Sequence, residues 1–267
     1  MKIDHRSWDK VADNEDFHGE DNPLWDYKRR ELTHLIKKWG GTYLQKGNIL
    51  KTDLIEEAIR PDHTLFWLAE NNHRVFGMDI SPRLTIYAKM RSEVRKSGIH
   101  FVACDIRDIS FKDDSFDLII SNSTCDHFPQ IDTALEELHR ILKPKGRLII
   151  TIHNKLELTL NLFISLKKIF KAMPELHFEC CYTPWNFKKM LQRAGFTVED
   201  STTNLHIPMG LWLLLGVFLN EVKKERARRF IFGLIQKIIS YLEKIEKRET
   251  VLNFISSVLI ACKASKL

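Results

Sequence analysis

Short apolar segments alternate with amphipathic ones through the middle of this chain. Strand character is found over residues 48–52, 74–80, 99–105, 116–121 and 147–153. Between these segments, apolar residues recur at helical spacing over residues 53–71 (interrupted near Pro61), 82–97 and 131–142. Strands that alternate with helices imply a parallel sheet with right-handed crossovers, so the pattern predicts an α/β fold. The fourth strand, "FDLIIS", is apolar enough to be buried on both faces.

The regular alternation ends after residue 153. Thr183 and Pro184 are typical of a helix start, and Gly195 is typical of the end of that helix. A sixth strand is expected from Phe196. The other predicted elements are an amphipathic helix over 158–173, an apolar run over 207–219, a basic amphipathic helix or helix pair over 222–247 and a last strand over 258–264. The apolar run is shorter than the roughly 20 residues that span a bilayer.

These elements predict a cap and a main domain. We expect residues 1–46 to form an N-terminal helical cap, with the clearest helical spacing from Arg30 to Trp39, on a main domain of residues 47–267. Within the main domain, residues 154–182 and 204–257 are expected to be helical insertions on the ligand side of the sheet. Both are rich in large apolar residues, so they are predicted to form a lid that excludes water from the site.

Composition narrows the class of protein. Of the 267 residues, 44% are hydrophobic and 10% are aromatic, which is enough to bury a core and argues against disorder. The N-terminal stretch is polar, so no secretory signal is expected. The five cysteines show no CxxC spacing. We therefore expect a reducing, cytoplasmic compartment and no metal site.

Positive charge is concentrated in one segment. The formal net charge is +6, and residues 221–248 hold nine Lys or Arg against four Asp or Glu. So local an excess is not typical of a nucleic-acid-binding surface, and no nucleic-acid partner is expected. Residues 207–248 could be a peripheral membrane contact at an anionic lipid surface, or a buried lid helix beside a solvated basic face. The sequence leaves the oligomeric state open.

Polar side chains follow several predicted strands. Asp79 ends the second strand, Asp105 ends the third, and Asn122 follows the fourth. In a parallel α/β sheet, ligands bind beyond the carboxyl ends of the strands, near the point where strand order reverses. A carboxylate at such a position can accept both hydroxyls of a ribose, or an amine of adenine. A single acid after a strand can also cap the next helix, which remains an alternative for Asp79.

The run from Val75 to Asn154 resembles the class I S-adenosylmethionine-dependent methyltransferases. The segments "VFGMDIS", "HFVACDIRDISFKDDSFDLIISNSTCDHF" and "ALEELHRILKPKGRLIIT" are similar in order and spacing to the second to fifth motif regions of that family. The segments "WNFKKMLQRAGFTVED" and "VLIACKA" are similar to its closing helix and β-hairpin. The resemblance implies a three-layer Rossmann-like fold with a seven-stranded, mostly parallel sheet whose last strand is antiparallel. It also implies S-adenosylmethionine as the cofactor.

The resemblance further implies roles for individual residues. Asp79 would hold the cofactor ribose and Asp105 the adenine amine. Ile80 and Ile106 would pack against the faces of the adenine. Asn122 would lie beside the methionine part of the cofactor.

The first turn of the fold departs from this family. The family has an acid and a glycine-rich turn after the first strand, whereas this chain has "GNILKTDLIEEA". Lys51, Thr52 and Asp53 supply a cation, a hydroxyl and an anion, which complement the carboxylate and ammonium of a methionine moiety. We therefore predict that these side chains replace the missing glycine contacts. The alternative is that the loop no longer binds a ligand.

A base is needed for methyl transfer only if the acceptor carries a proton, because alignment is otherwise the main requirement. His127 follows the fourth strand on the expected cofactor side and is the candidate catalytic base. A structural loop histidine is the alternative interpretation. Asp126 and His153 are weaker candidates for the same role.

Three functions are compatible with these features. The favoured interpretation is methyl transfer from S-adenosylmethionine to a small-molecule or lipid-like acceptor, with the acceptor atom unassigned. A catalytically inactive relative kept as a binding or assembly protein is the second interpretation. An NAD-dependent oxidoreductase is the least supported, since a pyrophosphate needs the GxGxxG turn that this chain lacks.

Overall fold

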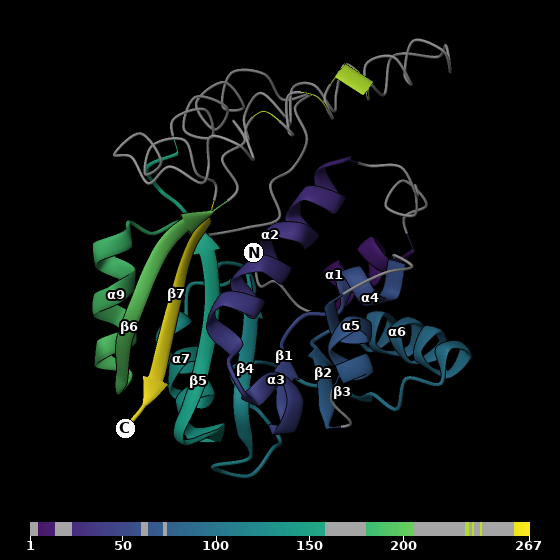
Figure 1. Cartoon of the computed structure of the whole chain (residues 1–267), viewed down its shortest axis with the longest axis horizontal. Coiled ribbons are helices and arrows are strands. Elements are labelled where there is room, and N and C mark those ends of the chain that lie inside the picture. The colour runs from purple at the N-terminus through teal and green to yellow at the C-terminus, as the bar shows by residue number, and fades with distance from the viewer. Residues whose placement is uncertain are drawn as a thin grey trace.

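Seven strands form one sheet in the computed structural model, which describes residues 5–13, 23–59, 64–71, 74–157, 180–204 and 259–267, and residues 233, 234, 237 and 241. In chain order the strands are β1 (Ile49–Lys51), β2 (Val75–Asp79), β3 (His100–Ala103), β4 (Phe116–Asn122), β5 (Leu142–His153), β6 (Phe196–Asn204) and β7 (Leu259–Lys266). Across the sheet their order is β3-β2-β1-β4-β5-β7-β6 (Figure 1). Strand β7 is antiparallel to both neighbours and the other pairs are parallel. The predicted mostly parallel sheet with an antiparallel last strand is confirmed.

Helices cover both faces of this sheet and give three layers (Figure 1). The described helices are α1 (His5–Ala12), α2 (Pro23–Gly40), α3 (Tyr43–Lys46), α4 (Ile55–Ile59), α5 (Thr64–Asn71), α6 (Pro82–Arg95), α7 (Ile131–Ile141) and α9 (Pro184–Arg193). One buried core joins α7 and α9 to one face of the sheet. A second core joins α2, α4, α5 and α6 to the other face.

Strand β4 shows how the sequence produces these layers. Leu118 and Ile120 belong to the core on the α2 side, while Ile119 between them belongs to the core on the α7 side. All three are fully buried. Successive side chains of a strand point to opposite faces, so a strand covered on both sides must be apolar throughout. The prediction that this strand is buried on both faces is confirmed.

Local sequence sets the ends of two helices. The hydroxyl of Ser81 accepts a hydrogen bond from Leu84 N at the start of α6, and the hydroxyl of Thr183 accepts one from Asn186 N at the start of α9. A proline follows each capping residue in the first turn, where its missing N–H costs nothing. Gly195 follows α9 with φ of 95°, a conformation that favours glycine. The predicted start and end of α9 are therefore confirmed.

The helical stretch predicted over residues 53–71, with an interruption near Pro61, is observed as two helices, α4 and α5, on either side of residues 60–63, which are not described. Strand β5 differs in extent from the prediction, since it begins at Leu142 rather than at Arg147. Its pairing with β4 shifts register between Phe116 and Leu118, opposite the "KPKG" segment, whose proline and glycine are typical of a turn. The Pro/Gly signal thus marks an irregularity inside the strand.

Several predictions fall on residues outside the described part of the chain. They are the helix over 158–173, the apolar run over 207–219, nearly all of the basic segment over 222–247, and most of both expected insertions. The lid and the membrane contact of residues 207–248 therefore stay predictions, as does the division into a cap and a main domain. Among the helices formed by described residues, none is both long and apolar enough to cross a membrane.

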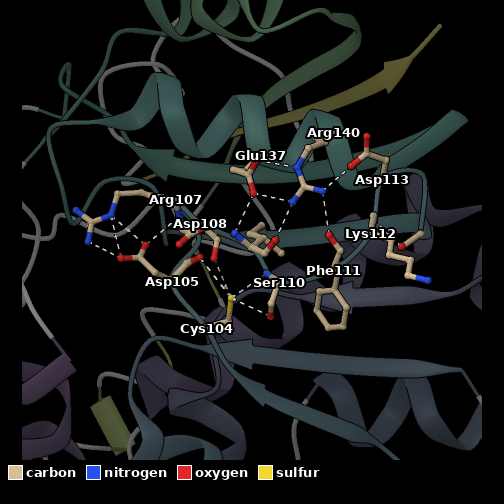
Figure 2. A network of polar contacts seen from close by, with 12 residues as sticks. Cys104, Asp105, Arg107, Asp108, Ser110, Phe111, Lys112, Asp113, Glu137 and Arg140 are labelled. Carbon is tan, nitrogen blue, oxygen red and sulfur yellow. Dashed lines mark hydrogen bonds and ion pairs between the residues drawn. The ribbon is translucent and has the colours of Figure 1, made fainter.

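An arginine-centred network holds the loop between β3 and β4. Figure 2 shows the guanidinium of Arg140 between Glu137 and Asp113, and it also donates to the carbonyls of Ile109 and Phe111. Glu137 accepts a hydrogen bond from Ile109 N at 2.9 Å. Because Glu137 and Arg140 of α7 in this way hold residues 109–113, this part of the loop after Asp105 has a fixed path.

Candidate functional site at the carboxyl edge of the sheet

The order of strands reverses between β1 and β4. These two strands are neighbours, with Lys51 paired to Ile120, and the chain runs from β1 to β2 and β3 on one side and from β4 to β5 on the other. A crevice outside the carboxyl ends of the strands at such a point is the usual ligand site of open α/β sheets. The described residues that follow β1, β2, β3, β4 and β5 therefore define the candidate site.

Asp79 joins the loops that follow β1 and β2. Its carboxylate accepts hydrogen bonds from Leu54 N at 2.9 Å and from Ser81 N at 2.8 Å. Burial raises the pKa of Asp79 to about 6, although both backbone bonds oppose this shift. The helix cap itself is Ser81, so Asp79 has no capping role for α6. Since each carboxylate oxygen can accept more than one hydrogen bond, the two backbone bonds leave capacity for ligand hydroxyls.

The first turn is built around the ammonium of Lys51. This side chain is fully buried and donates to Asp53 O at 2.6 Å and to Glu57 Oε2 at 2.9 Å, and its ammonium lies 3.1 Å from Asp53 Oδ2. These carboxylates raise the pKa of Lys51, against the effect of burial. Burial raises the pKa of Asp53, and the Lys51 charge opposes it. Lys51 thus donates two hydrogen bonds within the chain, and Asp53 Oδ2 is a buried oxygen with no hydrogen-bond partner among the described residues. Because Lys51 is fully buried in these contacts, it could reach a ligand only after rearrangement.

Thr52 and Asn122 occupy the seam between β1, β4 and β5. The Thr52 hydroxyl donates to Ser121 Oγ at 3.0 Å and lies 3.0 Å from Thr124 Oγ1. Asn122 Oδ1 accepts a hydrogen bond from Thr151 Oγ1 at 2.8 Å. Ser123 follows with φ of 51°, and its hydroxyl oxygen is buried with no hydrogen-bond partner among the described residues. This turn thus presents an unsatisfied hydroxyl at the point where strand order reverses.

Asp105 lies in the loop after β3, which ends at Ala103 rather than at Asp105 as predicted, and is paired with Arg107. Cys104 N donates to Asp79 O at 2.8 Å, which brings the ends of β2 and β3 together. The Arg107 guanidinium donates to both carboxylate oxygens of Asp105, at 3.0 Å from Nε and 2.6 Å from Nη2 (Figure 2). Partial burial opposes ionisation of Asp105, but the Arg107 hydrogen bonds hold its pKa below the usual value. Ile106 beside it is buried.

His127 lies beside two residues that the sequence ranked as weaker candidates. Its Nε2 is 3.7 Å from Oδ1 of Asp126, whose other oxygen contacts His153. The ring of Trp8 from α1 meets the His127 ring edge to face, with centroids 4.7 Å apart. The three polar candidates are thus gathered at the ends of β4 and β5. Within the described part of the chain, no three His, Cys, Asp or Glu residues are arranged to hold a metal ion.

The N-terminal helix α1 contacts both halves of this edge. While Trp8 packs on His127, Asp9 accepts a hydrogen bond from the Ser81 hydroxyl at 2.5 Å, and Asp13 forms an ion pair with Arg83. This helix therefore reaches from the loop after β4 to the start of α6. Sequence reasoning did not assign Trp8 or Asp9 to the site, because the contacts join segments more than 70 residues apart.

Two further residues were missed for different reasons. Glu57 is the fully buried partner of Lys51, and its position on the first turn after β1 was the available signal. Arg107 follows Asp105 by two residues and was not considered. Ile80 is half-buried next to Asp79, and its packing against adenine stays a prediction. None of these placements tests whether a cofactor is bound.

Fold and strand order define the class of protein as a Rossmann-like, methyltransferase-type α/β domain. A sequence model described as a methyltransferase domain matches residues 61–150. The phosphoethanolamine N-methyltransferase 2 of Haemonchus contortus, solved with phosphomonomethylethanolamine and S-adenosylhomocysteine, superposes with a TM-score of 0.54 at 17% identity. That match covers 89% of this chain and 52% of the other. The [4+2]-cyclase SpnF superposes with a TM-score of 0.58 at 16% identity, over 89% of this chain and 80% of that one.

Sequence similarity to curated methyltransferases covers part of the chain. The ubiquinone/menaquinone biosynthesis C-methyltransferase UbiE of Vibrio vulnificus is 34% identical over 86 residues, which is 31% of this chain and 31% of that relative. Residues 61–150 thus match a methyltransferase domain model, and a segment of the chain is similar to curated methyltransferases. It spans only about a third of the length of the quinone methyltransferase relatives that it matches. The structural neighbours, at such low identity, support the fold alone.

Proposed function

We propose that this protein transfers a methyl group from S-adenosylmethionine to a small-molecule or lipid-like acceptor. The observation that carries the proposal is the set of polar side chains at the carboxyl edge of β1 to β4, within a domain of the methyltransferase family. The quinone methyltransferase relatives support an organic, partly apolar acceptor. The cofactor would supply an electrophilic methyl group on a sulfonium sulfur.

The residues at this edge fit such a cofactor in charge and chemistry. S-adenosylmethionine carries two cationic groups and a ribose diol, and the edge presents the carboxylates of Asp53, Asp79 and Asp105. The buried, unsatisfied hydroxyl of Ser123 is one further group that a ligand could engage. Asp79 would hold the ribose, and Asp105 with Ile106 would hold the adenine.

The roles proposed for the first turn differ from residue to residue. Asp53 is partly exposed and can receive an ammonium, and Thr52 sets the end of β1 against β4. Lys51 holds Asp53 and Glu57 in place, and would contact the cofactor only after rearrangement. His127 would take a proton from the acceptor where the acceptor has one to lose.

Calorimetry with S-adenosylhomocysteine tests the cofactor assignment. We expect the wild-type protein to bind it, and Asp105→Asn and Asp79→Asn each to bind about tenfold more weakly, the equivalent of about 1.4 kcal/mol. Asp108→Asn is the matched control, since Asp108 is exposed on the same loop as Asp105. Absence of binding to the wild-type protein, or equal affinity for all four proteins, would refute the assignment.

Turnover is tested separately. The protein is incubated with S-adenosylmethionine carrying a labelled methyl group and a panel of quinols, phenols and amines, and label in the product is measured. Label transfer is expected for at least one class of acceptor. Tight binding of S-adenosylhomocysteine together with no transfer to any acceptor would favour the non-catalytic interpretation.

A further inference from the structure

Asp126 is a fully buried carboxylate placed between two histidines. It follows β4, and its Oδ2 accepts a hydrogen bond from His153 N at 2.9 Å and also contacts His153 Nδ1. His153 ends the neighbouring strand β5 and is itself buried. This oxygen therefore fixes both the backbone and the imidazole ring of His153.

The other oxygen of Asp126 has a different environment. Oδ1 is buried and has no hydrogen-bond partner among the described residues, and the nearest ring nitrogen is His127 Nε2 at 3.7 Å. A buried carboxylate oxygen without a donor is unfavourable, and native structures keep few of them. The separation is slightly too long for a hydrogen bond, but a small rotation of the His127 ring would form one.

Packing restrains both histidines. Trp8 from α1 packs edge to face against His127, while Cys180 N donates to Asp126 O at 3.0 Å and Tyr182 N donates to His153 O at 3.0 Å. Residues 180 and 182 thus hold the backbone of Asp126 and of His153. The Asp126 side chain is fully buried, so its carboxylate acts strongly on its neighbours.

Three titratable groups that face Asp126, namely Cys125, Cys181 and Tyr182, stay neutral near neutral pH. Burial, with a smaller contribution from the Asp126 charge, raises the pKa values of Cys125 and Cys181 to about 12 each. Burial also raises the pKa of Tyr182, and the charges of Asp132 and Asp126 raise it further. The positive charge of Lys155 lowers the pKa of Cys181 and so opposes the effect of burial. The described groups around Asp126 therefore leave the two histidines as the partners that can exchange a proton with it.

We propose that Asp126 is a positioning residue shared by the two histidines, and that the site methylates an acceptor hydroxyl. Oδ2 locks His153 in one orientation, and Oδ1 receives the Nε2–H of His127 once His127 has taken a proton. This inference rests on the proposed methyltransferase function. It adds the substrate class, since the O–H of a hydroxyl acceptor has to lose its proton as the bond to the methyl group forms, and His127 supported by Asp126 is placed to take it.

The step balances as follows. The acceptor O–H bond breaks and its proton goes to His127, whose imidazolium is stabilised by Asp126. An electron pair of the acceptor oxygen forms the new bond to the methyl group. The bond between the methyl carbon and sulfur breaks, and its electron pair remains on the sulfur. His127 then returns its proton to solvent.

Nitrogen-15 NMR of labelled histidine side chains tests the positioning role without any substrate. In the wild-type protein, His153 is expected in a single tautomer with Nδ1 protonated, and His127 is expected to titrate at a higher pH than in Asp126→Asn. In that variant, the His153 signals should shift toward a tautomer mixture. His139, which packs on Phe196 away from the site, is the internal reference and should be unchanged.

A second variant keeps the test decisive if Asp126→Asn folds poorly. His127→Gln leaves the Asp126–His153 contact intact, so the His153 signals should remain those of the wild type. With a hydroxyl acceptor, this variant should lose at least tenfold in kcat with little change in KM, and the loss should shrink as the pH rises. Unchanged histidine signals in Asp126→Asn, or altered His153 signals in His127→Gln, would overturn the shared-carboxylate role.

Failure of the role proposed for Asp126 can be distinguished from failure of the proposed methyltransferase function. Calorimetry should give equal S-adenosylhomocysteine affinity for wild type, Asp126→Asn and His127→Gln, because none of these side chains is assigned to the cofactor. Failure of the wild type to bind would reject the proposed function and leave the NMR result to stand by itself. Binding and transfer to amines, with none to hydroxyl acceptors, would reject only the substrate class.

Discussion

Replacing Lys51 by methionine removes the cation that lies between Asp53 and Glu57. The Lys51 and Glu57 side chains are both fully buried and 2.9 Å apart, with the partly exposed Asp53 carboxylate 3.1 Å away. At that separation and an effective dielectric constant of about 20, the Lys51–Glu57 attraction is about 6 kcal/mol before desolvation. Loss of one partner from a buried pair costs about 3–5 kcal/mol, because the other charge stays buried. We expect Lys51→Met to lower the free energy of unfolding by this amount.

Urea unfolding followed by circular dichroism measures the effect. The matched control is Lys46→Met, an exposed lysine on α3, which should change stability by no more than about 0.5 kcal/mol. The double variant Lys51→Met/Glu57→Gln should recover much of the loss, since both members of the pair are then uncharged.

The sign of the pH dependence follows from proton binding. In Lys51→Met, the carboxylates left without a cation should bind protons more readily in the folded state than in the unfolded state. The free energy of unfolding of the variant should therefore rise, relative to wild type, as the pH falls from about 8 to about 5. A cost below about 1 kcal/mol at pH 8, or a double variant whose cost equals the sum of the single variants, would refute this reasoning.

Three other predictions follow from contacts near the same edge. Burial raises the folded-state pKa of Asp79 from 3.8 to about 6, so between these pH values the folded state binds a proton that the unfolded state does not. The free energy of unfolding should therefore fall by up to about 3 kcal/mol as the pH rises through this window. Urea titrations of Asp79→Asn should lack that fall. Arg140→Met should lower the free energy of unfolding by about 1–2 kcal/mol in the same assay, because it removes the donors that hold the loop after β3. The cost is limited because the Arg140 side chain is partly exposed. Arg193→Met, at the exposed end of α9, is the control and should cost little. Asp9→Ala removes the acceptor of the Ser81 hydroxyl, so hydrogen-exchange mass spectrometry should find faster exchange in α1 and no change in α2; equal exchange in α1 would contradict the contact.

Most of the sheet could be predicted from the sequence because its strands are covered on both faces. A strand buried on both faces has to be largely apolar, and the runs that became β2, β4 and the later part of β5 are. The early start of β5 could not be predicted. Pro144 and Gly146 are turn residues by local preference, and only pairing of Leu142 with Phe116 on β4 brings this segment into the sheet.

The candidate site was predictable in position but not in contacts. Strand order brings Asp79 and Asp105 to adjacent strand ends, as expected for a sheet of this class. The side chain of Lys51, by contrast, turns inward to Glu57, six residues further along the chain. That direction depends on where α4 packs, which local sequence does not determine. The Asp126–His153 contact likewise depends on side-chain rotamers at two neighbouring strand ends.

The charge at this edge of the sheet bears on which class of cofactor it favours. Carboxylates from Asp53, Asp79 and Asp105 follow three adjacent strands, and the cations described among them, Lys51 and Arg107, are each already paired with a carboxylate. A dinucleotide would bring a diphosphate to the turn after β1, where backbone N–H groups and the start of a helix would have to neutralise it. Here that turn contains no glycine between Gly47 and Gly77, and Glu56 and Glu57 lie in the first turn of α4. A diphosphate would therefore meet negative charge, whereas a sulfonium and an ammonium would be attracted. The same side chains that depart from the usual glycine-rich turn thus favour a cationic cofactor over an anionic one.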